Sequence, residues 1–222
     1  MCLRKLFQKN NNAAIRFHDA GRGLAVYRYG SESGDLPLLP GLRIEVASDQ
    51  MIAFVQNGEL VDTWDEGSYV LGATMFPGLA ERGAFTRADR PVPAELYFLN
   101  LTRITDRKWA TRTPVLRNEN GKLYAIRAFG KMAYRIQDGI GFILEAFLNR
   151  KLQTSFELND YLATLTAGAF AAVAGEQNLP VTEIINHYAS LSDLVLMKAN
   201  QAAAPLGVEI TGVLIEGASL PD

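Results

Sequence analysis

The amino-acid sequence predicts an α+β protein in which an antiparallel, strongly curved β-sheet region is followed by helices and a C-terminal strand. Three observations support this prediction. Apolar and polar residues alternate with a period of two through much of residues 41–137. After Gln137 the period changes to about 3.6 residues, which is typical of helices. Residues 208–222 then return to a strand pattern. Strands segregated from helices in this order indicate an α+β fold.

The first part of the β-region predicts a meander of short antiparallel strands. Residues 42–46 alternate between apolar and charged side chains, as in a strand with one buried face. The segments 50–56 and 59–64 flank Asn57-Gly58. This pair accepts positive φ at both central positions of a two-residue hairpin turn. A second tight turn at Glu66-Gly67 leads into a further strand.

The second part of the β-region predicts longer strands. Prolines and glycines break the periodicity in residues 74–93, which indicates a crossing loop with one helical turn. Residues 94–102 are apolar on both faces, as expected of a central strand. Residues 104–111 form an edge-like strand whose pairing is interrupted at Pro114, because proline has no N–H to donate. Residues 122–136 are predicted to form the longest strand.

This longest strand has two different faces. Its core face presents apolar and aromatic residues: Tyr124, Ile126, Ala128, Met132, Tyr134 and Ile136. Its other face combines apolar groups with cationic ones: Leu123, Arg127, Phe129, Lys131 and Arg135. Aliphatic stems with charged tips are typical of an amphipathic surface rather than a core.

Three or four helices are predicted before the last strand. Asp138 is the expected N-cap of the first, and either Asn159 or Asp160 that of the second. Pro180 stands at or near the first position of the third, where proline is favoured. The helices cover residues 138–148, 158–178, 180–190 and 190–207. The chain is therefore expected to divide into an N-terminal, partly irregular segment (1–40), a β-rich subdomain (41–137) and a helical subdomain with the final strand (138–222).

Composition excludes several classes of function. The formal net charge of −2 disfavours a general nucleic-acid binder, which normally carries excess Lys and Arg. Cys2 is the only cysteine and His18 and His187 are the only histidines, so no intramolecular disulfide and no site with several Cys or His ligands can form. We expect no catalytic site, cofactor, metal or small-molecule substrate. No apolar run reaches the length of a membrane span.

The strongest local charge bias lies between Arg103 and Arg117. This stretch contains five cationic residues against Asp106 alone: Arg103, Arg107, Lys108, Arg112 and Arg117. Such a strand is either a basic edge that meets an anionic surface or a solvated edge that charge protects from pairing with another sheet. Trp109, in its middle, is either a partly buried anchor or an interfacial aromatic residue.

The N-terminus offers a second candidate contact. As a helix it would be a small basic amphipathic segment, formed by Leu3, Arg4, Lys5, Leu6 and Phe7. One such signal holds a membrane only weakly, and a frayed tail is the alternative. Cys2 is either an acylation site or an inert thiol.

Two further groups are weaker candidates. Asp62, Asp65 and Glu66 lie on a predicted turn and could hold a hard cation only with additional ligands, or serve an enzyme that uses carboxylates. His187 lies in a predicted helix with no nucleophile nearby in the sequence. The two interpretations of His187 are a core or surface histidine without a chemical role and a catalytic histidine.

Four sequence blocks, in order, resemble the SPFH (band 7) family, and especially its soluble bacterial "virion core protein-like" members. The blocks are "SDQMIAFVQNGELVDTWDEGSYVL", "ELYFLNLTRITDRKWATRTPV", "LYAIRAFGKMAYRI" and "VEITGVLIEGASLP". The similarity runs from about residue 40 to 220. It implies a wedge-shaped α+β domain that assembles side by side as a scaffold, usually at a membrane. It supplies no catalytic residues.

The chain departs from many relatives in two ways. We find no N-terminal hairpin or span in the sequence, and it stops at Asp222 where many relatives continue into a long helix or a zinc-ribbon tail. Either the sequence is truncated or assembly is expected to depend on the globular part alone. Ring formation is therefore an open question. The sequence leads to two main hypotheses. The first is a cytoplasmic scaffold that self-associates and docks peripherally at the inner face of a membrane, on anionic lipid or a membrane-protein partner, in a membrane-stress response. The second is a structural subunit of a larger particle without membrane contact.

Overall fold

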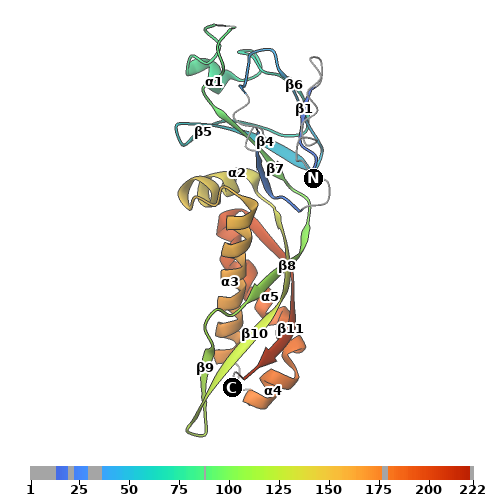
Figure 1. Ribbon diagram of the computed structural model, residues 1–222, viewed down its shortest axis with the longest axis vertical. Coiled ribbons are helices and arrows are strands. Elements are labelled where there is room, and N and C mark those ends of the chain that lie inside the picture. The colour runs from blue at the N-terminus through green and yellow to red at the C-terminus, as the bar shows by residue number, and fades with distance from the viewer. Residues whose placement is uncertain (1–13, 20–22, 30–36, 88, 177–179, 221–222) are drawn as a thin grey trace. The chain divides into compact units, whose positions relative to one another are not determined.

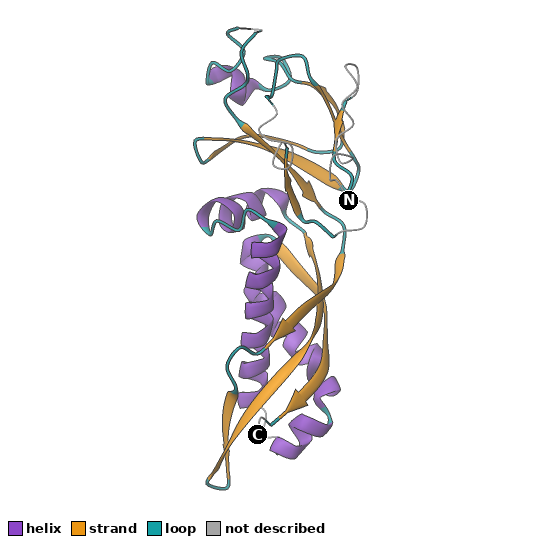
Figure 2. Ribbon diagram, in the orientation of Figure 1, coloured by secondary structure: helices purple, strands orange, loops and turns teal. Residues whose placement is uncertain are grey.

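The computed structural model describes residues 14–19, 23–29, 37–87, 89–176 and 180–220 (Figure 1). The chain forms two compact units. Unit 1 consists of Met1–Thr102 and Ala146–Ser155, and unit 2 of Arg103–Glu145 and Phe156–Asp222. The strands and helices confirm the predicted α+β class (Figure 2). The bounds of the units differ from those of the three predicted segments, because β-strands and helices pack together within unit 2.

Unit 1 contains two sheets and a short helix. Strand order is β1-β3-β6 in the three-stranded sheet and β2-β7-β4-β5 in the other. The strands of the first are β1 (Ile15–Arg16), β3 (Arg43–Val46) and β6 (Gly67–Val70). Those of the second are β2 (Val26–Arg28), β4 (Gln50–Gln56), β5 (Glu59–Trp64) and β7 (Glu95–Asn100). The helix is α1 (Pro77–Glu81).

The predicted hairpin at Asn57-Gly58 is confirmed, but the predicted meander is wrong in its pairing. Asn57 and Gly58 have φ of 53° and 79°, as a two-residue hairpin turn requires. They join β4 to β5 in an antiparallel pair. After the turn at Gly67, however, β6 pairs with β3 instead of β5. Local turn signals fix neighbouring strands and carry no information about which sheet the next strand joins.

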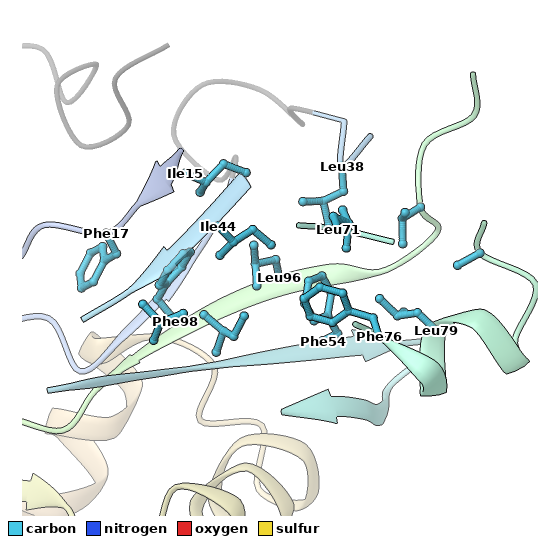
Figure 3. Close-up of a cluster of buried hydrophobic side chains, with 14 of the residues drawn as sticks. Ile15, Phe17, Leu38, Ile44, Phe54, Leu71, Phe76, Leu79, Leu96 and Phe98 are labelled. Atoms are coloured by element: carbon cyan, nitrogen blue, oxygen red, sulfur yellow. The ribbon is translucent and has the colours of Figure 1, made fainter. Parts of the chain in front are cut away.

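The core of unit 1 is a cluster of aliphatic and aromatic side chains from its sheets, the loops and α1 (Figure 3). Phe54 of β4 packs edge-to-face against Phe76, with ring centroids 5.0 Å apart. Both rings are fully buried. Strand β7 is the central strand that its apolar faces predicted, since it pairs with β2 on one side and β4 on the other.

Unit 2 is a four-stranded antiparallel sheet packed against helices. Strand β10 (Lys122–Ile136) pairs with β11 (Val208–Ser219) on one side. On its other side it pairs first with β9 (Val115–Glu119) and then with β8 (Ile104–Ala110). The bounds of β10 are those predicted, and the pairing is interrupted around Pro114 as predicted. The final strand returns to the sheet.

The helical segments follow β10 in the chain. They are α2 (Gly139–Gly141), the π-helix η2 (Phe142–Asn149), α3 (Ser155–Glu176), α4 (Val181–Asn186), the 3-10 helix η3 (Tyr188–Leu191), α5 (Ser192–Ala203) and the 3-10 turn η4 (Ala204–Leu206). Asp138 caps the first as predicted, because its carboxylate accepts a hydrogen bond of 3.0 Å from the Gly141 N–H. Gly207 ends the last with a φ of 70°.

The predicted start of α3 is wrong. The helix begins at Ser155, so Asn159 and Asp160 lie within it and cap nothing. Asn159 instead accepts a hydrogen bond from the Tyr134 hydroxyl (2.7 Å). The hydrophobic stripe begins only at Leu158, because Phe156 in the first turn is largely exposed. Periodicity therefore could not indicate this turn.

Candidate functional site

The sheet of unit 2 has one face covered by helices and one face open to solvent. Residues paired across β10 and its neighbours point to the same side of the sheet. Gly130, Met132 and Tyr134 of β10 lie on the covered side, opposite Ile215, Val213 and Ile210 of β11. We call this side the inner face and the opposite side the outer face.

Helices α3 and α5 hold the inner face. The Trp109 ring of β8 lies 6.0 Å from the Phe170 ring of α3, centroid to centroid. The Thr166 hydroxyl of α3 contacts the Met132 sulfur at 3.4 Å. From α5, the Asn200 side chain accepts a hydrogen bond of 3.0 Å from the Ile210 N–H of β11. These contacts pack the two helices against the inner face of the sheet.

The outer face exposes large apolar side chains. Leu123 and Phe129 of β10 are 61% and 53% exposed, and Leu214 of β11 is 50% exposed. Phe129 lies over Gly217 of β11. Single exposed apolar residues are ordinary, whereas several on one sheet face indicate a contact surface.

Cations outnumber anions on this outer face. The cations are Arg103, Lys108, Arg127, Lys131 and Arg135, and the anions are Asp106, Glu209 and Glu216. The Lys131 Nζ atom lies 3.3 Å from a Glu216 carboxylate oxygen, and the Arg135 Nε atom 2.6 Å from a Glu209 oxygen. Such exposed ion pairs contribute only about 0–1 kcal/mol to stability. The charges therefore remain available to a partner.

The predicted basic stretch divides between the two faces. Arg103 and Lys108 are exposed, and the Arg103 Nε donates a hydrogen bond of 2.9 Å to the Thr211 hydroxyl of β11. Arg107 is half-buried and lies opposite Met132 in the register, on the inner side. Arg112 follows β8, is exposed, and forms an ion pair with Asp160 of α3. The Arg117 guanidinium of β9 donates a hydrogen bond to the Ala174 carbonyl oxygen of α3. The five residues therefore do not form one continuous edge.

Trp109 is an anchor and does not lie on the surface. Its side chain is 3% exposed and contacts Phe170. Of the two alternatives that the sequence left open, the structure supports burial, so Trp109 does not belong to the contact surface. Leu3, Arg4, Lys5, Leu6 and Phe7 lie outside the described residues.

Sequence reasoning assigned Arg127, Phe129 and Lys131 to an amphipathic strand face but not to the site, and it missed Leu214. The signal for Leu214 was weak. Register shifts between Phe129 and Gly130 and between Ala133 and Tyr134 break the period of two along the β10–β11 pair. A bulge moves the next residue to the other face, so simple alternation misplaces residues of β11.

A groove of about 440 Å³ lies between α3 and the segment that joins β8 to β9. It is lined by residues 110–116 and by Thr164, Ala167, Gly168 and Ala171. Its one charged lining residue is Arg112, which is paired with Asp160. This lining has no pair of acid and base groups and no activated nucleophile, so it provides no arrangement for acid–base or nucleophilic catalysis.

The acidic turn is used for structure. The Asp62 carboxylate accepts hydrogen bonds from the N–H groups of Gly78 (3.2 Å) and Leu79 (2.8 Å), at the start of α1. Main-chain oxygens of Asp65 and Glu66 accept from the Tyr69 hydroxyl. Across the described part of the chain, no three His, Cys, Asp or Glu side chains group as metal ligands would.

His187 is a surface residue. Its Nδ1 atom lies 2.6 Å from a Glu183 carboxylate oxygen, one helical turn earlier. An exposed pair four residues apart on a helix is a common local contact. Within the described ranges, none of the helices is both long enough and apolar enough to span a membrane.

Comparison with known proteins places the chain in a family. A search of curated proteins finds no match. The sequence profile of the "SPFH domain-Band 7 family" matches residues 26–222, which include nearly all of the described elements. The specific virion core protein-like subgroup is not distinguished by this match. The chain therefore belongs to the SPFH (band 7) family.

Proposed function

We propose that this protein is a non-enzymatic SPFH scaffold that self-associates and docks peripherally at a membrane or on a membrane-bound partner. SPFH proteins generally have scaffold or membrane-associated roles. A cytoplasmic position at the inner membrane face and a part in a membrane-stress response, as in the virion core protein-like subgroup, belong to the same proposal.

The observation that carries the proposal is the open outer face of the unit 2 sheet. This face combines Leu123, Phe129 and Leu214 with an excess of cations. An antiparallel sheet can face water on one side, but that side is then normally polar. Exposed apolar residues ringed by charge favour contact with another surface.

An anionic surface suits the charges of this face. Lys108 and Arg127 are exposed and carry charge that acidic lipid head groups or an acidic protein could neutralise. Each cation near an anionic bilayer contributes about 1 kcal/mol. Arg103 and Arg112 extend this basic character on either side of Lys108 along the chain.

Vesicle flotation tests the membrane part. The full chain is mixed with vesicles of neutral lipid alone or with anionic lipid added. We expect flotation with anionic vesicles that decreases as salt rises. The variant Lys108→Glu/Arg127→Glu should float less. The control Arg43→Glu/Arg90→Glu makes the same charge change at exposed positions of unit 1 and should float like the wild type.

The outcomes distinguish the alternatives. A protein that stays at the bottom with both vesicle types does not bind lipid directly, and docking would then need a protein partner. Self-association without any lipid binding or membrane partner would support the second hypothesis, a structural subunit of a larger particle. A strict monomer at high concentration, measured by light scattering, would contradict the scaffold itself.

A further inference from the structure

The side of α3 that faces away from the sheet carries no charge through its middle. Residues 161–175 contain no Asp, Glu, Lys or Arg. The positions along this side are the exposed Thr164, Gly168 and Gly175 and the half-buried Ala171. Residues three or four apart share one side of a helix, so these four form one stripe. A helix at a protein surface normally presents charged or long polar side chains to water, and a helix that lacks them on every side is covered.

This stripe forms one wall of the groove between α3 and residues 110–116. Thr164, Gly168 and Ala171 line the groove, which has a volume of about 440 Å³. A Cβ atom added to Gly168 would meet no atom within 4 Å, and the same holds at Gly175. The distance between two packed helix axes depends on the side chains between them. The small side chains of the stripe therefore leave the main chain of α3 within reach of a second helix.

An ion pair stands at each end of the stripe. Near its start, Arg112 is paired with Asp160 of α3. Near its end, the Glu176 carboxylate lies 2.8 Å from the Lys198 Nζ atom of α5. Gly168 lies midway between Asp160 and Glu176 in the sequence. The uncharged stripe is therefore bounded at each end by one cation and one anion, with Gly168 at its centre.

We propose that α3 of one copy packs antiparallel against α3 of a second copy, about a two-fold axis near Gly168. Each helix then covers the groove beside the other. The proposal rests on the self-association part of the proposed function and names its interface. Helix α3 lies on the inner-face side of the sheet, so this contact leaves the outer face open to a membrane or a membrane-bound partner.

The stripe is complementary to itself, which favours a second copy as its occupant. With Gly168 at the axis, Asp160 of one copy lies opposite Glu176 of the other. Arg112 can then approach Glu176 across the contact, and Lys198 can approach Asp160. No charge loses its counter-ion, and the uncharged middle of one stripe meets that of the other. A surface that matches itself suits an isologous contact, in which residue i contacts residue j and j contacts i.

A cysteine at the centre of the stripe tests the contact directly. Cys2 is the only native cysteine, so the background is Cys2→Ser. Gly168→Cys places two thiols beside the axis, and a disulfide needs Cα atoms within about 7 Å of each other. We expect mild oxidation to give a covalent dimer on non-reducing electrophoresis, and reduction to reverse it. The matched control is Gln201→Cys, exposed on α5, which should not cross-link.

A large side chain at the same position should separate the two copies. Gly168→Arg puts a long side chain where the helices come closest. Arginine has a higher helix propensity than glycine, so the variant should fold, as circular dichroism and thermal melting check. By light scattering coupled to size exclusion, we expect the mass of two chains for the wild type and of one chain for Gly168→Arg. The control Gln201→Arg, which adds the same side chain to α5, should keep the mass of two chains.

The outcomes separate this interface from the proposed function. If Gly168→Arg associates as the wild type does, the α3 contact is wrong and self-association uses another surface. Cross-linking at Gln201→Cys but not at Gly168→Cys would overturn it as well. A monomeric wild type would contradict the interface and the scaffold together, and vesicle flotation would then decide whether the docking part stands. Loss of the dimer in Gly168→Arg with unchanged flotation supports the interface, because the outer face is intact in this variant.

Discussion

The ring of Phe129 lies over Gly217 on the neighbouring strand. The two residues are paired across β10 and β11, and a Cβ atom added to Gly217 would lie 2.7 Å from the Cε1 atom of the ring. Only glycine leaves room for the ring in this position. An aromatic ring over a cross-strand glycine stabilises a sheet, in part because it covers backbone that would otherwise face water.

Substitution of this pair should be non-additive. We expect Gly217→Ala to displace the ring and lower the free energy of unfolding by about 0.5–1 kcal/mol, the size of a cross-strand pair. With Phe129→Ala already present, the same change should cost nothing, because alanine suits a strand better than glycine. Urea unfolding of the two single variants and the double variant measures the coupling. Additive effects would mean that ring and glycine do not interact.

Gly207 connects the end of the helices to β11 and has no room for a side chain. Its φ is +70°, and an added Cβ would lie 2.3 Å from the Asp138 carbonyl oxygen and 2.5 Å from the Phe142 nitrogen. Both are main-chain atoms, so they cannot swing away. The Gly207 carbonyl also accepts hydrogen bonds from the N–H groups of Gln137 (2.9 Å) and Asp138 (3.1 Å).

We expect Gly207→Ala to lower the free energy of unfolding of unit 2 by more than about 3 kcal/mol, since it combines backbone strain with a main-chain clash. Gly121→Ala is the matched control. Its φ is +78°, but no atom lies within 4 Å of the added Cβ. It should cost only about 1–2 kcal/mol, the cost of the left-handed conformation. If the two variants lost the same free energy of unfolding, the main chain around Gly207 would have moved enough to relieve the clash.

Local signals were sufficient to predict most individual elements. Residues 122–136 were correctly bounded because Asn120-Gly121 begins the strand with a tight turn, and both residues have positive φ. Asp138 then marks the change from strand to helix with its side chain. The turn and the helix cap each depend on only a few neighbouring residues, so a single sequence is enough to predict them.

Non-local features could not be predicted in the same way. The pairing of β6 with β3 depends on how unit 1 closes its core, not on the turn at Gly67. The π-helix over Phe142–Asn149 has the apolar composition of an ordinary helix. Ser155, which starts α3, uses its hydroxyl to accept from the Ala25 N–H, 130 residues earlier in the chain. Contacts between residues so far apart in the sequence do not appear in its hydrophobic periodicity.

Composition alone could indicate a basic stretch but not the side of the sheet on which each of its residues lies. The charge bias of residues 103–117 is real, but strand alternation sends Trp109 and Arg107 to the inner side and Lys108 to the outer side. Residues of β11 could not be included because the sequence does not give its register with β10.

The neighbours Lys108 and Trp109 should respond very differently to truncation. Trp109 is buried against Phe170, so Trp109→Ala should lower the free energy of unfolding by about 3–5 kcal/mol. Lys108 is exposed on the outer face. Lys108→Ala should therefore change the free energy of unfolding by less than about 0.5 kcal/mol. Circular dichroism during urea unfolding measures both. A small loss for Trp109→Ala would contradict the anchoring role.

Trp109→Phe is a useful intermediate. The indole Nε1 is buried and finds no hydrogen-bond partner within the described structure. Phenylalanine retains much of the aromatic contact with Phe170 and has no N–H to bury unpaired. We therefore expect this variant to be less destabilised than Trp109→Ala by at least about 1 kcal/mol, since a buried unsatisfied donor costs about 1–3 kcal/mol.

Alkaline pH should destabilise both units through buried tyrosines. Burial raises the pKa of Tyr134 well above its ordinary value of 10.0. Burial, reinforced by the neighbouring Glu95 charge and hydrogen bond, does the same to the pKa of Tyr97 in unit 1. Below pH 10 these tyrosines are neutral in both the folded and the unfolded chain. Above it the unfolded chain loses protons that the folded chain retains, so the stability of the fold decreases as pH rises.

For unit 2 the effect should be measurable at Tyr134. Each pH unit above 10 should lower the free energy of unfolding by about 1.4 kcal/mol for this residue. Trp64 and Trp109 lie in different units, so Trp64→Phe makes fluorescence report on unit 2 alone. Tyr134→Phe in this background should reduce the slope of stability against pH, although it also loses the hydrogen bond to Asn159. An unchanged slope would mean that Tyr134 ionises as easily in the folded protein as in the unfolded chain.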